Sequence, residues 1–165
     1  MIYRAATTLA DAALRAVSPL ASAALRQRML MDDPPPAIPG GIWVHGASVG
    51  ELNSARPVIE ALAAERSVLV TANTETGRTV AQGWGLPARL APLDVPGALG
   101  RFLDAARPAL MLTVENEIWP NRAAQARRRG IAQAVIGARM SARSAGRWGR
   151  ARGCAAAPRA SRPAS

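Results

Sequence analysis

The stretch Ile42-Trp43-Val44-His45-Gly46-Ala47-Ser48-Val49-Gly50-Glu51 decides the fold. It opens with a short run of β-forming residues, passes through a turn of small residues and leads into residues 52–64, which favour a helix. A strand that feeds a helix through a tight turn is the beginning of a βαβ unit. The stretch therefore predicts an α/β fold.

The same alternation of strand and helix continues to residue 137. We expect strands at 42–45, 67–72, 88–92, 109–114 and 131–137, and helices at 52–64, 75–82, 96–106 and 120–129. The strand segments are almost wholly apolar, as parallel strands are when helices cover both faces of their sheet. The predicted fold class is therefore α/β: a Rossmann-like parallel sheet with helices on both faces.

An amphipathic helix is expected ahead of the sheet, because residues 1–31 are rich in Ala and Leu. Arg4, Arg15 and Arg26 recur every 11 residues, close to three helical turns, so they are expected on one face. Two interpretations remain open: the helix packs on its own domain, or it lies on an anionic membrane surface. Residues 32–41, rich in Pro and Gly, predict a linker.

Charge is distributed unevenly along the chain. The 165 residues include 21 Arg, no Lys and 11 acidic residues, which gives a formal net charge of +10. Residues 1–117 sum to −1 and residues 118–165 to +11. Residues 141–165 contain no Ile, Leu, Val, Met, Phe or Tyr, so we expect a disordered basic tail after a domain at 42–140. A frameshift in GC-rich DNA tends to produce such a composition, and the tail is interpreted as a possible out-of-frame product.

Composition also bears on the class of protein. One cysteine and one histidine exclude a disulfide scaffold, a Cys-rich zinc site and a multi-histidine metal site. No uncharged apolar run approaches the roughly 20 residues of a membrane span. Residues 46–50 match the G-x-S-x-G nucleophile elbow, but a triad on that fold needs a histidine after the serine, and His45 precedes Ser48. A serine hydrolase is therefore not expected.

Polar residues follow three of the predicted strands. Glu51 begins a helix, where it either only complements the helix dipole or acts as a general base at the ligand-binding edge of the sheet. Glu115 and Glu117 either mark a helix start or form a second wall of the same cleft. Residues 71–77 carry hydroxyl groups that cap the next helix or bind ligand.

Four segments in this order resemble the N-terminal domain of the 3-deoxy-D-manno-octulosonic acid (Kdo) transferases of lipopolysaccharide assembly. They are Ile42 to Glu51, Val70 to Gly77, Val114-Glu115-Asn116-Glu117-Ile118-Trp119-Pro120-Asn121 and Gly137-Ala138-Arg139-Met140-Ser141-Ala142-Arg143-Ser144. Pro92-Leu93-Asp94-Val95-Pro96 also fits the family. The resemblance covers about residues 40–147.

The resemblance implies one half of a GT-B glycosyltransferase, an enzyme of two Rossmann-like domains facing across a cleft. The family transfers Kdo from CMP-Kdo to the lipid A precursor, lipid IVA, with inversion and without a required metal or other cofactor. It works at the cytoplasmic face of the bacterial inner membrane, held there by its N-terminal helix. The N-terminal domain binds the acceptor lipid.

Roles for individual residues follow from the same resemblance. Glu51 matches the general base of the family, and Ser48 and Gly50 shape the loop that presents it. Glu115 and Glu117 match acidic positions on the acceptor side of the cleft. Arg139 matches the last motif of the N-terminal domain, where it is expected to meet phosphate or the interdomain hinge.

Three features depart from the family pattern. The N-terminal helix carries more charge than a typical membrane anchor of the family. Gly46 stands where a bulkier residue is expected. Nothing in the 165 residues corresponds to the second domain, which binds CMP-Kdo, so a truncated chain that is inactive alone is expected. The alternative to this assignment is a small basic binding protein for anionic lipid or nucleic acid. The low aromatic content, 4%, makes nucleic acid the less expected partner.

Overall fold

A computed structural model describes residues 2–115 and 119–137. Its centre is a parallel sheet of five strands in the order β3-β2-β1-β4-β5. The strands are β1 (Ile42–His45), β2 (Val68–Ala72), β3 (Ala88–Leu90), β4 (Leu110–Val114) and β5 (Ala132–Ile136). The helices between them are α3 (Val49–Glu65), α4 (Glu75–Gly83), α5 (Pro96–Ala106) and α6 (Pro120–Arg128). The predicted α/β class, with a Rossmann-like parallel sheet, is confirmed.

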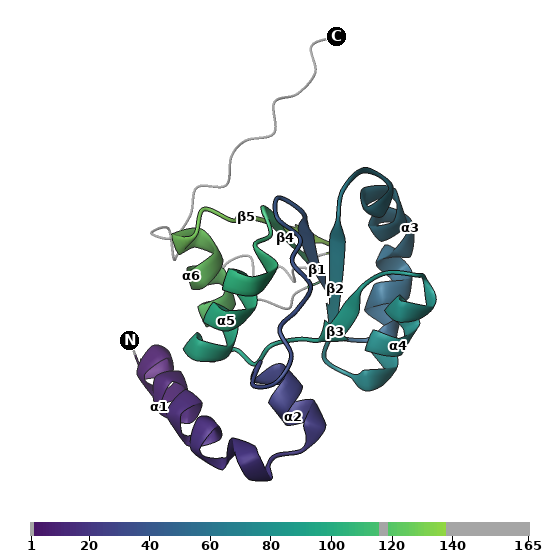
Figure 1. The fold of residues 1–165 in the computed structure, drawn as a ribbon. Helices are drawn as coiled ribbons and strands as arrows, with labels where there is room; N and C mark the ends of the chain where they lie inside the picture. The colour runs from purple at the N-terminus through teal and green to yellow at the C-terminus, as the bar shows by residue number, and fades with distance from the viewer. Residues whose placement is uncertain (1, 116–118, 138–165) are drawn as a thin grey trace, which may run out of the picture.

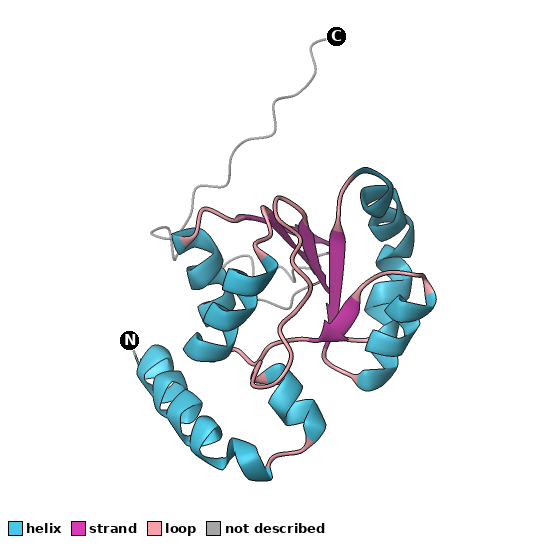
Figure 2. Cartoon of the chain, in the orientation of Figure 1, coloured by secondary structure: helices cyan, strands magenta, loops and turns pink. Residues whose placement is uncertain are grey.

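The helices cover the two faces of the sheet in pairs (Figures 1 and 2). The chain builds outward from β1 to β2 and β3, then returns to the other side of β1 for β4 and β5. Because parallel crossovers are right-handed, this reversal places α3 and α4 on one face and α5 and α6 on the other. The predicted covering of both faces is therefore confirmed for the central strands.

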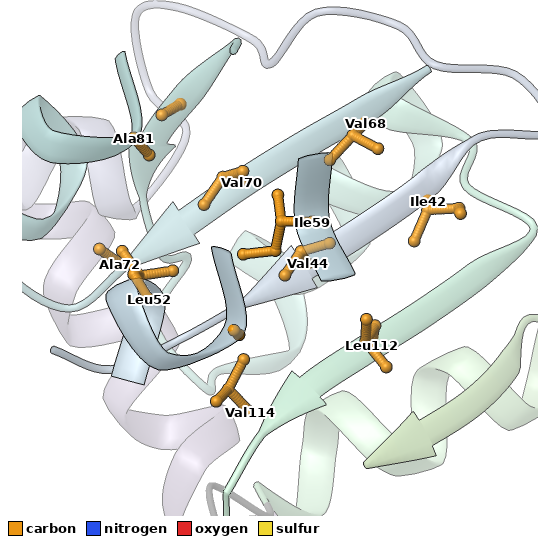
Figure 3. Close-up of a cluster of buried hydrophobic side chains, with 12 residues drawn as sticks. Ile42, Val44, Leu52, Ile59, Val68, Val70, Ala72, Ala81, Leu112 and Val114 are labelled. Atoms are coloured by element: carbon orange, nitrogen blue, oxygen red, sulfur yellow. The ribbon is translucent and has the colours of Figure 1, made fainter. Parts of the chain in front are cut away.

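Alternate residues of β1 enter two separate cores. Val44 joins the core under α3, where it packs with Leu52 and Ile59 (Figure 3). Trp43 points into the other core, where its ring centroid lies 4.5 Å from that of Phe102 in α5. All four residues of β1 are buried. This is why apolar and polar residues do not alternate along the strand, although it ends in the polar residue His45.

The strand β5 differs from the expectation of strands covered on both faces. Three of its five residues are exposed, and Val135 keeps 45% of its surface accessible. Among the described strands β5 lies at the edge of the sheet, beside β4. Its apolar sequence does not by itself bury it, since burial depends on what packs against it.

The N-terminal segment forms more than the single predicted helix. It consists of α1 (Ile2–Val17), a short 3-10 turn η1 (Ser18–Leu20) and α2 (Ala23–Arg28). Pro19 cannot continue a helix, and Ser22 starts a new one by accepting a hydrogen bond from the Leu25 N–H at 3.3 Å. Arg15 and Arg26 consequently lie on different helices, so the prediction of one shared basic face is wrong.

Helix α1 packs on its own domain through polar contacts and through Leu14. The Tyr3 hydroxyl donates to Asp94 at 2.7 Å, and Asn121 donates to the Thr7 hydroxyl at 2.9 Å. Asp11, only 8% exposed, forms a 2.9 Å ion pair with Arg15. This pair occupies the space that a Cβ atom on Gly97 of α5 would need. The interpretation of a helix packed on its domain is confirmed by these contacts.

Three large apolar residues of the N-terminal segment are exposed. Leu9 is 74% exposed, Val17 50% and Leu20 92%. Leu14 of α1 does pack inward, against the cluster of Met29, Val95 and Ala98. The second interpretation, contact with a membrane surface, stays open for the three exposed residues.

Residues 32–41 contain no helix or strand, as predicted for a linker, yet they are fixed to the domain. Ile38 is buried in the core and its N–H donates to the Ala106 carbonyl at 2.8 Å. Arg89 donates to the Asp33 carboxylate at 2.8 Å and to the Pro34 carbonyl at 2.9 Å. The expected tail at 141–165, and the C-terminal part of the predicted 42–140 domain, lie outside the described residues.

Candidate functional site

The order of the strands defines a switch point between β1 and β4. His45 pairs with Thr113 across this junction, so the loop that follows β1 and the residue that follows β4 lie side by side. From here the chain leaves toward β2 on one side and toward β5 on the other. Open α/β sheets bind their ligands outside the carboxyl ends of the strands at such a point. The two predicted acidic positions Glu51 and Glu115 flank it.

The loop after β1 holds Glu51 in a variant of the capping box, in which its carboxylate bonds to the backbone N–H of the residue before the N-cap. Ser48 is the N-cap of α3, and its hydroxyl oxygen accepts from the Glu51 N–H at 3.3 Å. Glu51 Oε2 accepts from the Ala47 N–H at 2.7 Å, and Oε1 accepts from the Ser48 hydroxyl at 3.3 Å. The structural role of Glu51 at the helix start is therefore present. The pattern S-x-x-E at residues 48–51 could have predicted this box from the sequence.

The capping box gives the two carboxylate oxygens of Glu51 different surroundings. Oε2 is held by a short bond from a backbone amide, which fixes the direction of the carboxylate. Among the residues that the structure describes, Oε1 contacts Ser48 at the longer distance, and a carboxylate oxygen has capacity to accept a further hydrogen bond. Glu51 is half-buried and Ser48 is exposed. The arrangement can therefore accept a proton at Oε1 without dismantling the turn.

The two glycines of this loop have different surroundings. A Cβ atom on Gly46 would lie 2.8 Å from Leu52 Cδ2, so a larger residue requires Leu52 to move. A Cβ atom on Gly50 would meet only Ser48 Oγ, at 3.9 Å, among the residues that the structure describes. Gly50 therefore leaves open surface in the first turn of α3.

The polar groups of residues 71–77 make structural hydrogen bonds of different kinds. Thr74 caps α4, since its hydroxyl oxygen accepts from the Gly77 N–H at 3.1 Å. Thr71 is buried in β2, where its hydroxyl oxygen lies 3.0 Å from His45 Nδ1 and accepts from the Trp43 indole at 2.8 Å. The Asn73 N–H donates to the Ala47 carbonyl at 3.2 Å and ties this loop to the first. Capping, one of the two interpretations, is confirmed.

Glu115 stands at the end of β4 in an uncommon conformation. Its φ is +59°, which only a few per cent of residues other than glycine adopt. Its N–H donates to the Ile136 carbonyl at 2.7 Å, and its side chain is exposed. Backbone strain of this kind gathers at functional sites. Glu117 and Arg139, the other predicted site residues, lie outside the described residues.

Asp94 joins this edge of the sheet although it was predicted only as part of a fitting motif. It follows β3, and its carboxylate accepts from the backbone N–H groups of Asn121 and Arg122 at 3.1 and 2.8 Å. These are donors of the first turn of α6, which follows the acidic segment (residues 115–117) in the sequence. Sequence spacing could not reveal the contact, because 27 residues separate the partners.

A small pocket opens next to the start of α6. Its volume is about 170 Å³ and its lining includes Thr113, Trp119 and Arg122. Neither Glu51 nor Glu115 belongs to the lining. The two carboxylates therefore stand on the loops themselves rather than inside this cavity.

Comparison with known proteins bears directly on this arrangement. The family model described as 3-deoxy-D-manno-octulosonic-acid transferase (Kdo transferase) matches residues 15–161. This chain belongs to the Kdo transferase family. The match extends beyond both ends of the 40–147 range that the motifs predicted.

Individual Kdo transferases agree with this membership. The chain is 41% identical over 120 residues to the enzyme of Bordetella pertussis and 36% identical over 118 residues to that of Haemophilus influenzae. The alignments cover 67% and 68% of this chain, and 28% of each relative. A probable mitochondrial Kdo transferase of Arabidopsis thaliana is 35% identical over 113 residues, 65% of this chain and 25% of the relative. The chain thus spans under a third of the length of these relatives.

The N-terminal helix is of particular interest in this family, since the sequence predicts contact with a membrane. Across residues 2–115 and 119–137, no helix has the length and apolar character needed to cross a bilayer.

The capping box makes a prediction about stability. Replacing Ser48 by Ala should lower the free energy of unfolding by about 1 kcal/mol, because the first turn of α3 loses its N-cap. The matched control is Ser54→Ala, since the Ser54 hydroxyl only donates to the Glu51 carbonyl at 2.7 Å on the exposed side of α3. Urea denaturation followed by circular dichroism measures both variants. Equal stability of the two would show that Ser48 is not a functioning cap.

The strained backbone at Glu115 makes a second prediction. Glu115→Gly should raise the free energy of unfolding by roughly 0.5–1 kcal/mol, because relief of left-handed strain exceeds the entropy that glycine adds to the unfolded chain. Arg107, with φ +52° at the end of α5, provides the control Arg107→Gly, which should behave alike. Thermal and urea denaturation test both. A loss of stability confined to Glu115→Gly would mean that its side chain, not its strain, governs the local structure.

Proposed function

We propose that this chain forms the acceptor-binding half of a glycosyltransferase that moves Kdo from CMP-Kdo to lipid IVA, the lipid A precursor. Family membership supports the reaction class. The single observation that carries the residue assignment is the placement of Glu51 and Glu115 on neighbouring loops at the β1–β4 switch point. Two carboxylates there suit the recognition and deprotonation of a sugar hydroxyl.

In the proposed mechanism Glu51 is the general base. The acceptor hydroxyl oxygen attacks the anomeric carbon of Kdo while Glu51 Oε1 takes the hydroxyl proton. The bond from that carbon to the phosphate oxygen breaks, and CMP leaves with the bonding electrons. The Ala47 N–H keeps Oε2 in place, so the base is oriented before the acceptor arrives. Ser48 and Gly50 form the turn that presents it, with Gly50 leaving room for the acceptor.

The acidic segment after β4 supplies the other side of the proposed acceptor site. Glu115 is exposed at the switch point, where it can accept hydrogen bonds from sugar hydroxyls. We assign Glu117 to the same surface and Arg139 to an acceptor phosphate. The donor CMP-Kdo is assigned mainly to the part of the transferase that this chain does not span. The chain is therefore expected to bind acceptor but to transfer no Kdo alone, with no metal or other cofactor involved.

The N-terminal segment is proposed to rest on the cytoplasmic face of the inner membrane. Its polar side is engaged with the domain through Tyr3 and Asp11, so the exposed side with Leu9, Val17 and Leu20 is available to lipid. An amphipathic helix in this position binds at the headgroup boundary instead of crossing the bilayer. Contact with the membrane would bring the acceptor edge close to a lipid substrate.

The proposed base can be tested in the complete transferase that contains this domain. Glu51→Gln should reduce Kdo transfer from CMP-Kdo to lipid IVA by roughly 100-fold or more, because the amide cannot accept the hydroxyl proton. Glu60→Gln, on the exposed surface of α3, is the matched control and should keep normal activity. Radiolabelled Kdo incorporation gives the rates. Normal transfer by Glu51→Gln with an intact fold would remove Glu51 as the base.

The membrane contact can be tested with this chain alone. Leu9→Ser and Leu20→Ser should each weaken binding to phosphatidylglycerol vesicles by roughly tenfold, because each removes a leucine from the lipid boundary. The control is Val58→Ser, a similarly apolar and exposed position on α3, at 44% exposure. Vesicle co-sedimentation measures the binding. Equal effects at all three positions, or none, would contradict a membrane face on the N-terminal segment.

A further inference from the structure

One carboxylate contacts both the N-terminal helix and the helix that follows the acidic segment. Asp94 Oδ2 accepts from the Tyr3 hydroxyl at 2.7 Å and from the Asn121 N–H at 3.1 Å. Oδ1 accepts from the Arg122 N–H at 2.8 Å. We propose that Asp94 is a positioning residue that couples the docking of α1 to the placement of the first turn of α6 at the carboxyl edge of the sheet. The relevance of this coupling to catalysis rests on the proposed function, but the test of the coupling does not.

Asp94 acts as the N-cap of α6 from a distant part of the chain. The residue at the cap position is Trp119, whose indole has a donor but no acceptor for backbone N–H groups. Pro120 follows at the first helical position and has no N–H, so Asn121 and Arg122 supply the donors of the first turn. Both donate to Asp94. The start of α6 is therefore set by the loop after β3.

The side chain of Asn121 extends the same contact to α1. It is 3% exposed, and its amide nitrogen donates to the Asp94 carbonyl at 2.7 Å and to the Thr7 hydroxyl at 2.9 Å. Thr7 and Tyr3 lie one turn apart on α1. Helix α1 is thus joined to this region by two hydrogen bonds, one between Tyr3 and Asp94 and one between Thr7 and Asn121. Displacement of α1 would remove a partner from both residues that define the start of α6.

The described residues on either side of positions 116–118, Glu115 and the first turn of α6, are each held by hydrogen bonds. At one end the Glu115 N–H is bonded to the Ile136 carbonyl in the neighbouring strand. At the other end the first turn of α6 is bonded to Asp94, and the Arg122 guanidinium lies 5.2 Å from the Trp43 ring in the sheet. Asp94 and Asn121 also bond to α1, through Tyr3 and Thr7 respectively. Under this proposal the position of the first turn of α6 depends on whether α1 is docked.

Tyr3 is the single tyrosine of the chain, which makes it a specific reporter of docking. Partial burial, together with the hydrogen bond to Asp94 and its negative charge, raises the pKa of Tyr3 to about 12 from its ordinary value of 10.0. The protonated phenol is the form that docks. Its contribution is complete below pH 10, the ordinary value, and is lost as pH rises through about 12.

The test uses the 165-residue chain without lipid or CMP-Kdo. Ultraviolet titration follows Tyr3, and hydrogen exchange by NMR follows the amides of Asn121 and Arg122. In Asp94→Asn the Tyr3 midpoint should fall toward 10 and both amides should exchange about fivefold faster, since a cap is weakened. In Tyr3→Phe the two amides should exchange roughly two- to tenfold faster, although no atom of α6 has changed.

The controls separate coupling from general loss of stability. Asp104→Asn removes an α5 carboxylate that pairs with Arg129 at 3.0 Å and should leave both readouts unchanged. The Glu51 amide, capped by Ser48 on the other face of the sheet, should keep its exchange rate in every variant. Unchanged exchange of Asn121 and Arg122 in Tyr3→Phe would overturn the coupling, as would an Asp94→Asn effect on only one of the two readouts. Since neither readout involves sugar transfer, these outcomes leave the Glu51 test independent.

Discussion

The parallel pairing of β1 with β4 is the constraint on which the rest of the structure depends. It places β1, the first strand in the sequence, in the middle of the sheet. The strands β2 and β3 then lie on one side of β1, and β4 and β5 on the other. The handedness of the crossovers then fixes α3 and α4 on one face and α5 and α6 on the other. The same pairing brings the loop of Glu51 beside Glu115, so one set of backbone hydrogen bonds builds both the fold and the candidate site.

The candidate site uses local structure for two purposes. Glu51 completes the capping box of α3 through Ala47 and Ser48, and the same bonds orient the carboxylate that we propose as the base. Glu115 holds a strained backbone conformation at the end of β4. Stabilising a helix start and presenting a proton acceptor are therefore compatible here, because one carboxylate has two oxygens in different surroundings. Membership of the Kdo transferase family supports the proposal that this geometry serves sugar transfer.

Local patterns predicted most of the fold, and long-range contacts account for what they missed. The apolar runs and the glycine-rich turns placed the strands and sheet helices close to their observed bounds, such as α5 at Pro96–Ala106. The prediction of a single N-terminal helix was wrong, because Pro19 interrupts the helix despite the Ala- and Leu-rich composition. At the site, the S-x-x-E pattern of residues 48–51 is enough to predict the cap of α3. The cap of α6 by Asp94 joins residues far apart in the sequence, so no short sequence pattern predicts it.

The central claim is that the acceptor lipid binds at the carboxyl ends of β1 and β4. Amide chemical-shift mapping of the chain by NMR, during titration with lipid IVA, tests it most directly. We predict the largest shifts in residues 46–51, at Glu115 and at the start of α6, with small shifts at the amino ends of the strands. Shifts concentrated at the amino ends, around Gly41 and Ala109, would contradict the assignment of the site to the β1–β4 switch point.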